Sequence, residues 1–266
     1  MIKNKKAKWI ARVVLLVGTV ISLFYVPWIL VKAWILPLPD TIQEQVDEAI
    51  GHGFDGMIVY VDLAGKPPQF YTGGWKDRQK RIPADPNSLF KIASISKLYA
   101  AVAATKLVKE NRLSFDKTLA EYLPELKDRI ENSEEITLKM MIQHRSGIPN
   151  FTDNPAYWNN EEENGKDALE FALDLPANFK PDKGYGYSNT HYLLLRRIMD
   201  DVLGYNHNEY IKEKILVPLG LKNTFFSITE VDLDDVMSGY YVGYEEDFKA
   251  NEYGMLATAE DVGHFI

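Results

Sequence analysis

The longest apolar stretch of the chain lies near its N-terminus. Residues 13–31 (VVLLVGTVISLFYVPWILV) contain no charged side chain, and as one helix they would extend about 29 Å, close to the hydrocarbon thickness of a bilayer. Tryptophans lie near both ends, and basic residues precede the run at Lys3, Lys5, Lys6, Lys8 and Arg12. The positive-inside rule predicts a single-pass transmembrane helix in the cell membrane, with a cytoplasmic N-terminus and the remaining chain extracytoplasmic.

Two alternatives fit this N-terminal segment less well. A cleaved signal peptide would have a shorter apolar region, and no small-x-small cleavage site precedes the Leu36–Pro39 stretch. A buried helix of a soluble domain would leave the basic flank and the tryptophans unexplained. We therefore interpret residues 1–39 as a cytoplasmic tip, an anchor in the lipid bilayer and a linker, with Pro27 as a point where the helix can kink.

Residues 40–266 combine strand and helix patterns. Helical spacing of apolar residues at 41–50 precedes two β-branched and aromatic runs, 56–62 and 69–73, which form a predicted hairpin. A run rich in Ala, Leu and Lys predicts a helix that begins at Ser94. Helical patterns dominate from about 115 to 215, where the acidic run Glu161–Glu163 is interpreted as a solvated loop. This order predicts an α+β fold, a sheet flanked by helices with a helical subdomain inserted.

Composition excludes several classes of function. The chain has no cysteine, which excludes disulfides, thiolate metal sites and cysteine nucleophiles. Residues 40–266 contain 24 basic and 38 acidic side chains, a formal charge of −14 that repels phosphate backbones, so nucleic acid is not an expected partner. The five histidines show no metal-ligand spacing, and no G-x-S-x-G element is present, so neither a metalloenzyme nor a Ser-His-Asp hydrolase is predicted.

An S-x-x-K motif occurs twice, at Ser88–Lys91 and Ser94–Lys97. Residues three apart share a face only on a helix, where the amine can reach the hydroxyl and the two can act as base and nucleophile. Ser94 opens the predicted helix, whereas Ser88 belongs to a turn region that leads into it. Ser94 is therefore the candidate nucleophile and Lys97 its base, and the hydroxyl of Ser88 is interpreted as a turn or capping group.

A second candidate element is Tyr187-Ser-Asn189, within the Gly- and Tyr-rich segment 184–190. A phenol and an amide two residues apart can point the same way from an extended loop, where one transfers a proton and the other holds an amide. Taken alone, this segment is more typical of a Gly- and Tyr-rich turn whose ring packs on the core. His144 and His191 are interpreted as structural, with His191 as an alternative pocket residue.

Together these elements resemble class C β-lactamases, DD-carboxypeptidases and related esterases, members of the β-lactamase and penicillin-binding-protein superfamily. The similarity covers about residues 54–266 and follows five segments in order, Phe90–Lys97, Leu138–Pro149, Tyr187–Asn189, Pro218–Thr224 and Gly254–Asp261. It implies a β-lactamase/transpeptidase-like fold in which Ser94 forms an acyl-enzyme, Lys97 and Tyr187 handle the proton, and Asn189 binds the substrate amide. No cofactor or metal is implied, and the implied substrates are β-lactams, D-alanyl peptides or esters.

The sequence departs from that family's pattern in two places. Pro181-Asp-Lys-Gly184 stands where the family has a tighter Pro-Gly turn. No Lys-Thr-Gly or His-Thr-Gly element follows Asn189, so we expect residues 40–266 to be a serine hydrolase domain whose C-terminal strands lie beyond Ile266, and this form to be inactive without them. The missing element leaves one alternative open, a non-catalytic receptor for penicillin or wall fragments.

Overall fold

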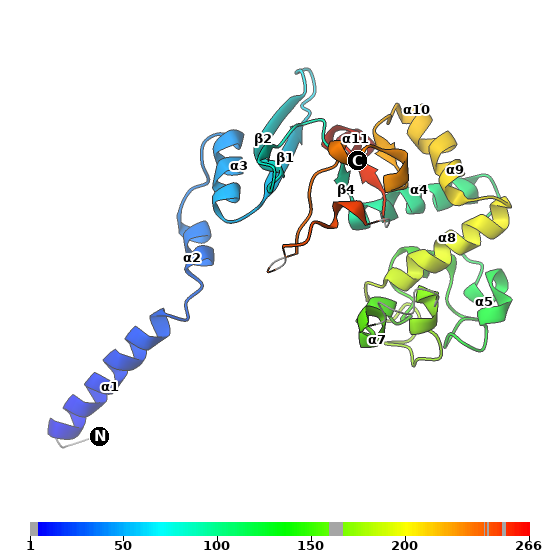
Figure 1. Ribbon diagram of the computed structural model, residues 1–266. Helices are drawn as coiled ribbons and strands as arrows, with labels where there is room; N and C mark the ends of the chain where they lie inside the picture. The colour runs from blue at the N-terminus through cyan, green and yellow to red at the C-terminus, as the bar shows by residue number, and fades with distance from the viewer. Residues whose placement is uncertain (1–4, 160–166, 242, 244, 252–253) are drawn as a thin grey trace.

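The computed structural model of the chain describes residues 5–159, 167–241, 243, 245–251 and 254–266. The predicted acidic loop at Glu161–Glu163 lies outside these residues. The described chain combines two small antiparallel sheets with a helical region, and it confirms the predicted α+β class. In Figure 1, one long helix extends away from everything else, and the C-terminus lies near the centre of the remaining structure.

The N-terminal segment forms two helices, and the predicted helix is interrupted next to Pro27, where a kink was expected. Helix α1 (Lys5–Leu23) and helix α2 (Trp28–Ile35) meet at a bend of 80°. Pro27 explains the break, because its ring collides with the carbonyl group four residues earlier and it lacks an N–H. Among the described residues no single helix has the length and hydropathy to cross a membrane, whereas this bent pair meets both requirements together.

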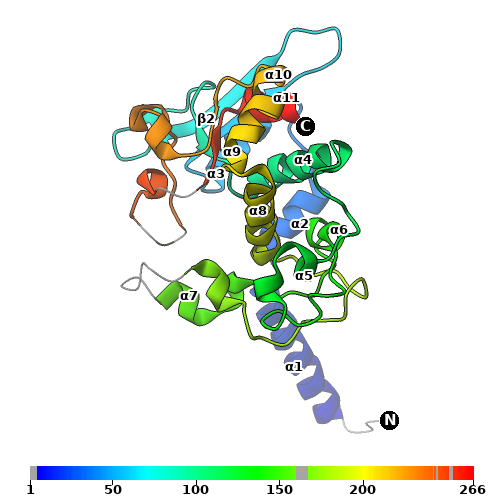
Figure 2. The same cartoon turned by 90° about the vertical axis from the view of Figure 1, so that its right-hand side faces the viewer.

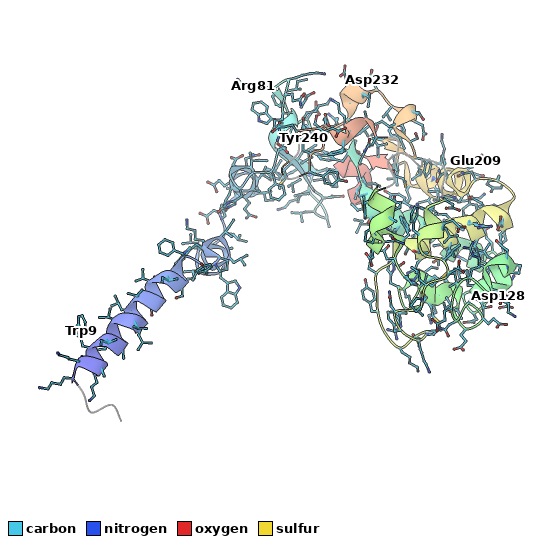
Figure 3. The ribbon with its side chains drawn as sticks, turned by 60° about the horizontal axis from the view of Figure 1, so that its bottom comes forward. Trp9, Arg81, Asp128, Glu209, Asp232 and Tyr240 are labelled. Carbon is cyan, nitrogen blue, oxygen red and sulfur yellow. The ribbon has the colours of Figure 1, made fainter. Side chains whose placement is uncertain are left out.

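Apolar side chains cover the surface of α1 and α2. Trp9, which Figure 3 labels far from the helical region, is 66% exposed, and none of the residues in the two helices is buried. At the bend, the Trp28 indole donates a hydrogen bond of 2.9 Å to the carbonyl oxygen of Leu23, which satisfies one of the free carbonyls at the end of α1.

The first sheet is built on the predicted hairpin. Strand β1 (Gly56–Val61) pairs antiparallel with β2 (Gln69–Asp77), which pairs in turn with β3 (Ile82–Pro83). Helix α3 (Ile42–Gly51) lies against β2 at Gly73, where a side-chain Cβ would come within 2.7 Å of Val46. Glycine at this position therefore permits the close approach of helix and sheet.

The second sheet joins segments that are far apart in sequence. Its strands are β4 (Phe90–Lys91), β5 (Thr224–Phe225) and β6 (Leu256–Ala257), in the order β4-β6-β5. Helix α11 (Ala259–Phe265) follows β6 and lies against β1. The last part of the described chain thus returns to the side of the molecule where the hairpin lies (Figure 1).

Helices and turns make up the rest, and no strand longer than an isolated bridge occurs in the described part of residues 115–215. The central elements are α4 (Ser96–Lys109) and α8 (Asn189–Leu203), which pack together. Figure 2 shows α8 running from the region of α4 to the region of α5 and α7. The shorter helices are α5 (Leu119–Tyr122), α6 (Leu138–Ile142), α7 (Pro155–Asn159), α9 (His207–Ile211) and α10 (Val217–Leu219).

The main hydrophobic core lies between α4 and α8. Helix α4 contributes Tyr99 and Ala103, and α8 contributes Leu194 and Leu195, all of them fully buried. Phe265 of α11 stacks on Tyr99, with 3.8 Å between the ring centroids, and so connects the C-terminal helix to this core. A packed core of this kind holds the first turn of α4 and the start of α8 in a defined relation, and both carry candidate site residues.

Candidate active site

Ser94 lies in a tight turn directly before α4. The prediction that the α-helix begins at Ser94 is wrong by two residues, because residues 93–95 form a 3₁₀ turn and α4 begins at Ser96. The turn still places residues three apart on one side, and Lys97 Nζ donates a hydrogen bond of 3.0 Å to Ser94 Oγ. Ala93 has φ of 44°, in the left-handed region that costs a residue with a Cβ about 1–2 kcal/mol. The hydroxyl of Ser94 is therefore presented by a strained backbone.

Tyr187 and Asn189 reach Ser94 from the start of α8. Ser188 is the residue that caps α8, and Tyr187 lies in the loop just before it. The Tyr187 phenol and Ser94 Oγ are 2.8 Å apart and share a hydrogen bond, and the same phenol donates to Asn189 Oδ1 over 3.3 Å. The structure thus brings all four predicted site residues into one connected group.

The charge of Lys97 acts on the phenol of Tyr187. Burial raises the pKa of Tyr187. Hydrogen bonding with Lys97 and Ser94 and the positive charge of Lys97 together lower the pKa by more than burial raises it, so the net pKa is below its ordinary value. Lys97 Nζ also lies 5.1 Å from the centre of the Tyr187 ring. The ammonium of Lys97 favours the phenolate form of Tyr187, and a phenolate in contact with the Ser94 hydroxyl can accept its proton.

Asn150 and Thr152 hold Asn189 in place, and the sequence reasoning missed both. The backbone N–H of Asn189 donates to Asn150 Oδ1 over 2.9 Å, and its side-chain amide donates to Asn150 Oδ1 and Thr152 Oγ1 over 3.3 Å each. Asn150 directly follows the Leu138–Pro149 segment. That position next to a family-like segment was the one signal in the sequence that could have identified it.

The unusual loop at Pro181–Gly184 keeps a tight turn by a different route. Asp182 has φ of 61°, the left-handed conformation that glycine adopts most easily. Arg145 stabilises it, because Arg145 Nε lies 2.6 Å from Asp182 Oδ1 and the backbone N–H of Asp182 donates to the Arg145 carbonyl over 2.9 Å. A specific ion pair therefore accompanies the aspartate at this turn.

His144 and His191 lie side by side beneath residues 184–188, the tyrosine loop, which carries Tyr187. Their Nδ1 atoms are 2.9 Å apart, and the centre of the His144 ring is 4.6 Å from that of Tyr187. His191 is 0% exposed, so it does not line a pocket, and the hydrogen-bonded interpretation of the residue agrees with its contacts. Burial and the neighbouring His144 lower the pKa of His191 to about 3, and burial and the charge of Lys97 lower the pKa of His144.

Comparison with known proteins identifies the family of the chain. A profile of the family described as Beta-lactamase matches residues 38–266. Protein flp of Staphylococcus aureus (strain MW2) is 26% identical over 244 residues, 86% of this chain and 49% of the relative. Penicillin-binding protein 4* of Bacillus subtilis (strain 168) is 24% identical over 219 residues, 81% of this chain and 47% of the relative. The chain thus spans about half the length of these two relatives.

Solved structures show the same fold. The D-amino acid amidase of Ochrobactrum anthropi SV3 superimposes with a TM-score of 0.73 at 21% identity, over 84% of this chain and 69% of the amidase. At that level of identity the agreement concerns the fold, and it confirms the β-lactamase-like α+β arrangement expected from the sequence.

Proposed function

The chain belongs to the beta-lactamase family, and from that premise we propose that it is a serine hydrolase that forms an acyl-enzyme on Ser94. The observation that carries this proposal is the contact of Ser94 Oγ with both Lys97 Nζ and the Tyr187 phenol, at 3.0 and 2.8 Å. A serine hydroxyl is a weak nucleophile unless adjacent groups accept its proton, and these two side chains are within reach.

The proposed reaction has two steps. Ser94 Oγ attacks the substrate carbonyl, its proton passes to the Lys97 and Tyr187 pair, and that pair returns a proton to the departing nitrogen or oxygen, which leaves an ester on Ser94. A water molecule then attacks the ester and releases the acid and free Ser94. Asn189 lies beside the phenol, where its side-chain amide would bind an amide group of the substrate.

The proposed substrates are D-amino-acid peptides or amides, β-lactams and esters. Two relatives support this range by their names, a penicillin-binding protein and a D-amino acid amidase. All of these substrates present a carbonyl to a serine nucleophile, and the exposed position of Ser94 leaves room for one.

Labelling with a fluorescent penicillin and with an activated ester, followed by peptide mapping, tests the proposal. Wild type and Ser88→Ala should carry the adduct on Ser94, and Ser94→Ala should carry none. An adduct on Ser88, or equal labelling of Ser94→Ala, would refute the assignment. Turnover that Ser94→Ala abolishes would exclude a non-catalytic receptor for such compounds.

The proposal includes attachment to the cell membrane through α1 and α2. Five basic residues precede the apolar run, and the apolar side chains of both helices are exposed. In this arrangement the N-terminus is cytoplasmic and residues from about 40 onward are extracytoplasmic. Protease added to spheroplasts should digest the large domain and spare the N-terminal lysines, and protection of the large domain would reverse the orientation.

A further inference from the structure

A buried polar cluster lies directly beneath the tyrosine loop. Its members are His144, Ser146 and His191, which are 9%, 0% and 0% exposed. Ser146 Oγ contacts His191 Nε2 at 2.5 Å, and the backbone N–H of Ile148 donates to Ser146 Oγ over 3.0 Å. Buried polar groups are costly unless each donor meets an acceptor, so the protons of this cluster can be assigned from its contacts.

The backbone N–H of Ser188 donates a hydrogen bond of 3.2 Å to His144 Nδ1. That nitrogen must therefore be an unprotonated acceptor, and the proton of the neutral His144 ring lies on Nε2. His191 Nδ1, 2.9 Å from the same nitrogen, must then carry a proton and donate it. His191 Nε2 is left as an acceptor for the hydroxyl of Ser146, which in turn accepts from Ile148.

This chain of contacts ends at the backbone between two site residues. Ser188 separates Tyr187 from Asn189, so the imidazole of His144 holds the peptide that joins them. The carbonyl of His144 also accepts a hydrogen bond of 2.9 Å from the backbone N–H of Gly186, on the other side of Tyr187. His144 therefore accepts hydrogen bonds from the backbone on both sides of Tyr187.

The backbone of His144 supports a role for its side chain. His144 follows the end of α6 with φ of 58°, at a type of position where helices commonly place glycine or asparagine. The imidazole at this position is buried and hydrogen-bonded, which indicates that the position requires the side chain of histidine and not only a left-handed backbone.

We propose that His144 and His191 are a neutral positioning pair, in which His191 Nδ1–H donates to His144 Nδ1 and so fixes the Tyr187–Asn189 segment against Ser94. The role of this pair in acylation rests on the proposed function. The positions of its protons and its contact with the backbone of Ser188 do not depend on that function. A protonated His144 would direct its Nδ1–H at the donors of Ser188 and His191, and the loop would lose its anchor.

The surroundings favour the neutral state of both rings. The titratable groups that face His144 are Lys97 of α4, Tyr185 and Tyr187 of the loop, and His191 and Tyr192 of α8. None of these is a carboxylate that would stabilise an imidazolium. Burial lowers the pKa of both histidines, in the same direction.

Nitrogen-15 NMR of the histidine rings at neutral pH tests the pair without any substrate. His144 should show its proton on Nε2 and His191 on Nδ1, and His191→Leu, His144→Gln and the control His207→Gln would assign the signals. His207 suits the control because it pairs with Asp200 in a different part of the fold. A proton on His144 Nδ1, or on His191 Nε2, would overturn the proposal.

A second measurement reads the effect on Tyr187. Absorbance titration of each protein, minus the same protein with Tyr187→Phe, isolates this phenol. In His191→Leu its pKa should rise towards the ordinary value, because the phenol moves away from Lys97, and in His191→Asn it should stay low, because the asparagine amide can still donate to His144. An unchanged titration in a folded His191→Leu protein would overturn the proposal.

Acylation then separates this inference from the proposed function. If penicillin labels the wild type, His191→Leu should label about tenfold to a hundredfold more slowly, as expected for a misplaced reacting group, and His191→Asn should remain within a few fold. Equal rates in all three proteins would overturn the positioning role. If no acyl probe labels the wild type, the proposed function fails, and the NMR and titration results still decide the histidine pair.

Discussion

The two S-x-x-K segments have the same spacing and opposite environments. Ser88 is 2% exposed, and its hydroxyl has no hydrogen-bond partner among the described residues. Lys91 Nζ turns away from Ser88 and donates to the carbonyls of Phe248, over 3.0 Å, and Asn251. Ser94, by contrast, is exposed and accepts a hydrogen bond from Lys97 Nζ over 3.0 Å.

Local backbone conformation accounts for the difference. Lys91 belongs to strand β4, and Ser88 lies before that strand and outside any helix, so no helical turn places the two side chains on one face. Residues 93–97 form a 3₁₀ turn and the start of α4, where residues three apart lie on one face. The S-x-x-K spacing therefore brings the lysine amine to the serine hydroxyl only where the backbone is helical.

The largest expected effect separates the two lysines. Lys97→Ala should reduce the rate of acylation by about 10²–10⁴, the usual contribution of a general acid–base group. Lys91→Ala should leave the rate within a few fold, because Lys91 Nζ donates to the backbone carbonyls of Phe248 and Asn251, which do not belong to the Ser94 site. Stopped-flow labelling with a chromogenic ester measures both, with melting curves as the control for folding. Similar losses in the two variants would remove the distinction between the segments.

The second effect concerns the proton acceptor that Ser94 has and Ser88 lacks. Tyr187→Phe removes one hydroxyl that contacts Ser94, and acylation should fall by about 10² or more. Tyr192→Phe is the matched control, since its hydroxyl donates to the Ile142 carbonyl and its ring lies 5.8 Å from Lys97 Nζ. Equal rates in Tyr187→Phe and wild type would make Tyr187 a structural residue.

A smaller effect comes from the histidine support beneath the Ser94 site. His191 has a pKa of about 3 in the folded protein and an ordinary value of 6.5, so between these values the unfolded chain binds more protons than the native state. Stability should be greatest above pH 6.5 and decrease as the pH falls towards 3. In this window His191 should contribute a slope approaching about 1.4 kcal/mol per pH unit.

Urea unfolding at several values between pH 7 and pH 4 measures that slope. His191→Asn should depend less on pH than wild type, since it removes this group and leaves the other histidines in place. Parallel stability curves for the two proteins would show that His191 does not titrate differently in the folded and unfolded states.

The smallest effect is expected at Ser88. Because its buried hydroxyl has no partner in the described structure, Ser88→Ala removes a desolvated polar group and should change the free energy of unfolding by less than about 1 kcal/mol, towards greater stability. Urea denaturation of Ser88→Ala and wild type at neutral pH measures the change. A loss of more than about 1 kcal/mol would mean that the hydroxyl is bonded in solution.

The sequence by itself determined the features that depend on neighbours along the chain. The hairpin followed from two β-branched runs and a turn between them, and the pairing of β1 with β2 confirms it. The contact of Lys97 with Ser94 followed from helical spacing, although the α-helix begins two residues later than expected. Local periodicity is sufficient for such features because backbone geometry repeats over three or four residues.

Only the tertiary structure decided which distant side chains meet. Ser94 and Tyr187 are 93 positions apart and touch because α4 and α8 pack on one core. His144 and His191 are 47 positions apart, and their pairing depends on the same packing. The bend at Pro27 was open from sequence, since proline can either kink or end a helix. The spacing of residues in the sequence does not show which side chains meet when folding brings distant segments together. The free-energy cost of an unpaired polar group depends on its burial, which the tertiary structure also sets.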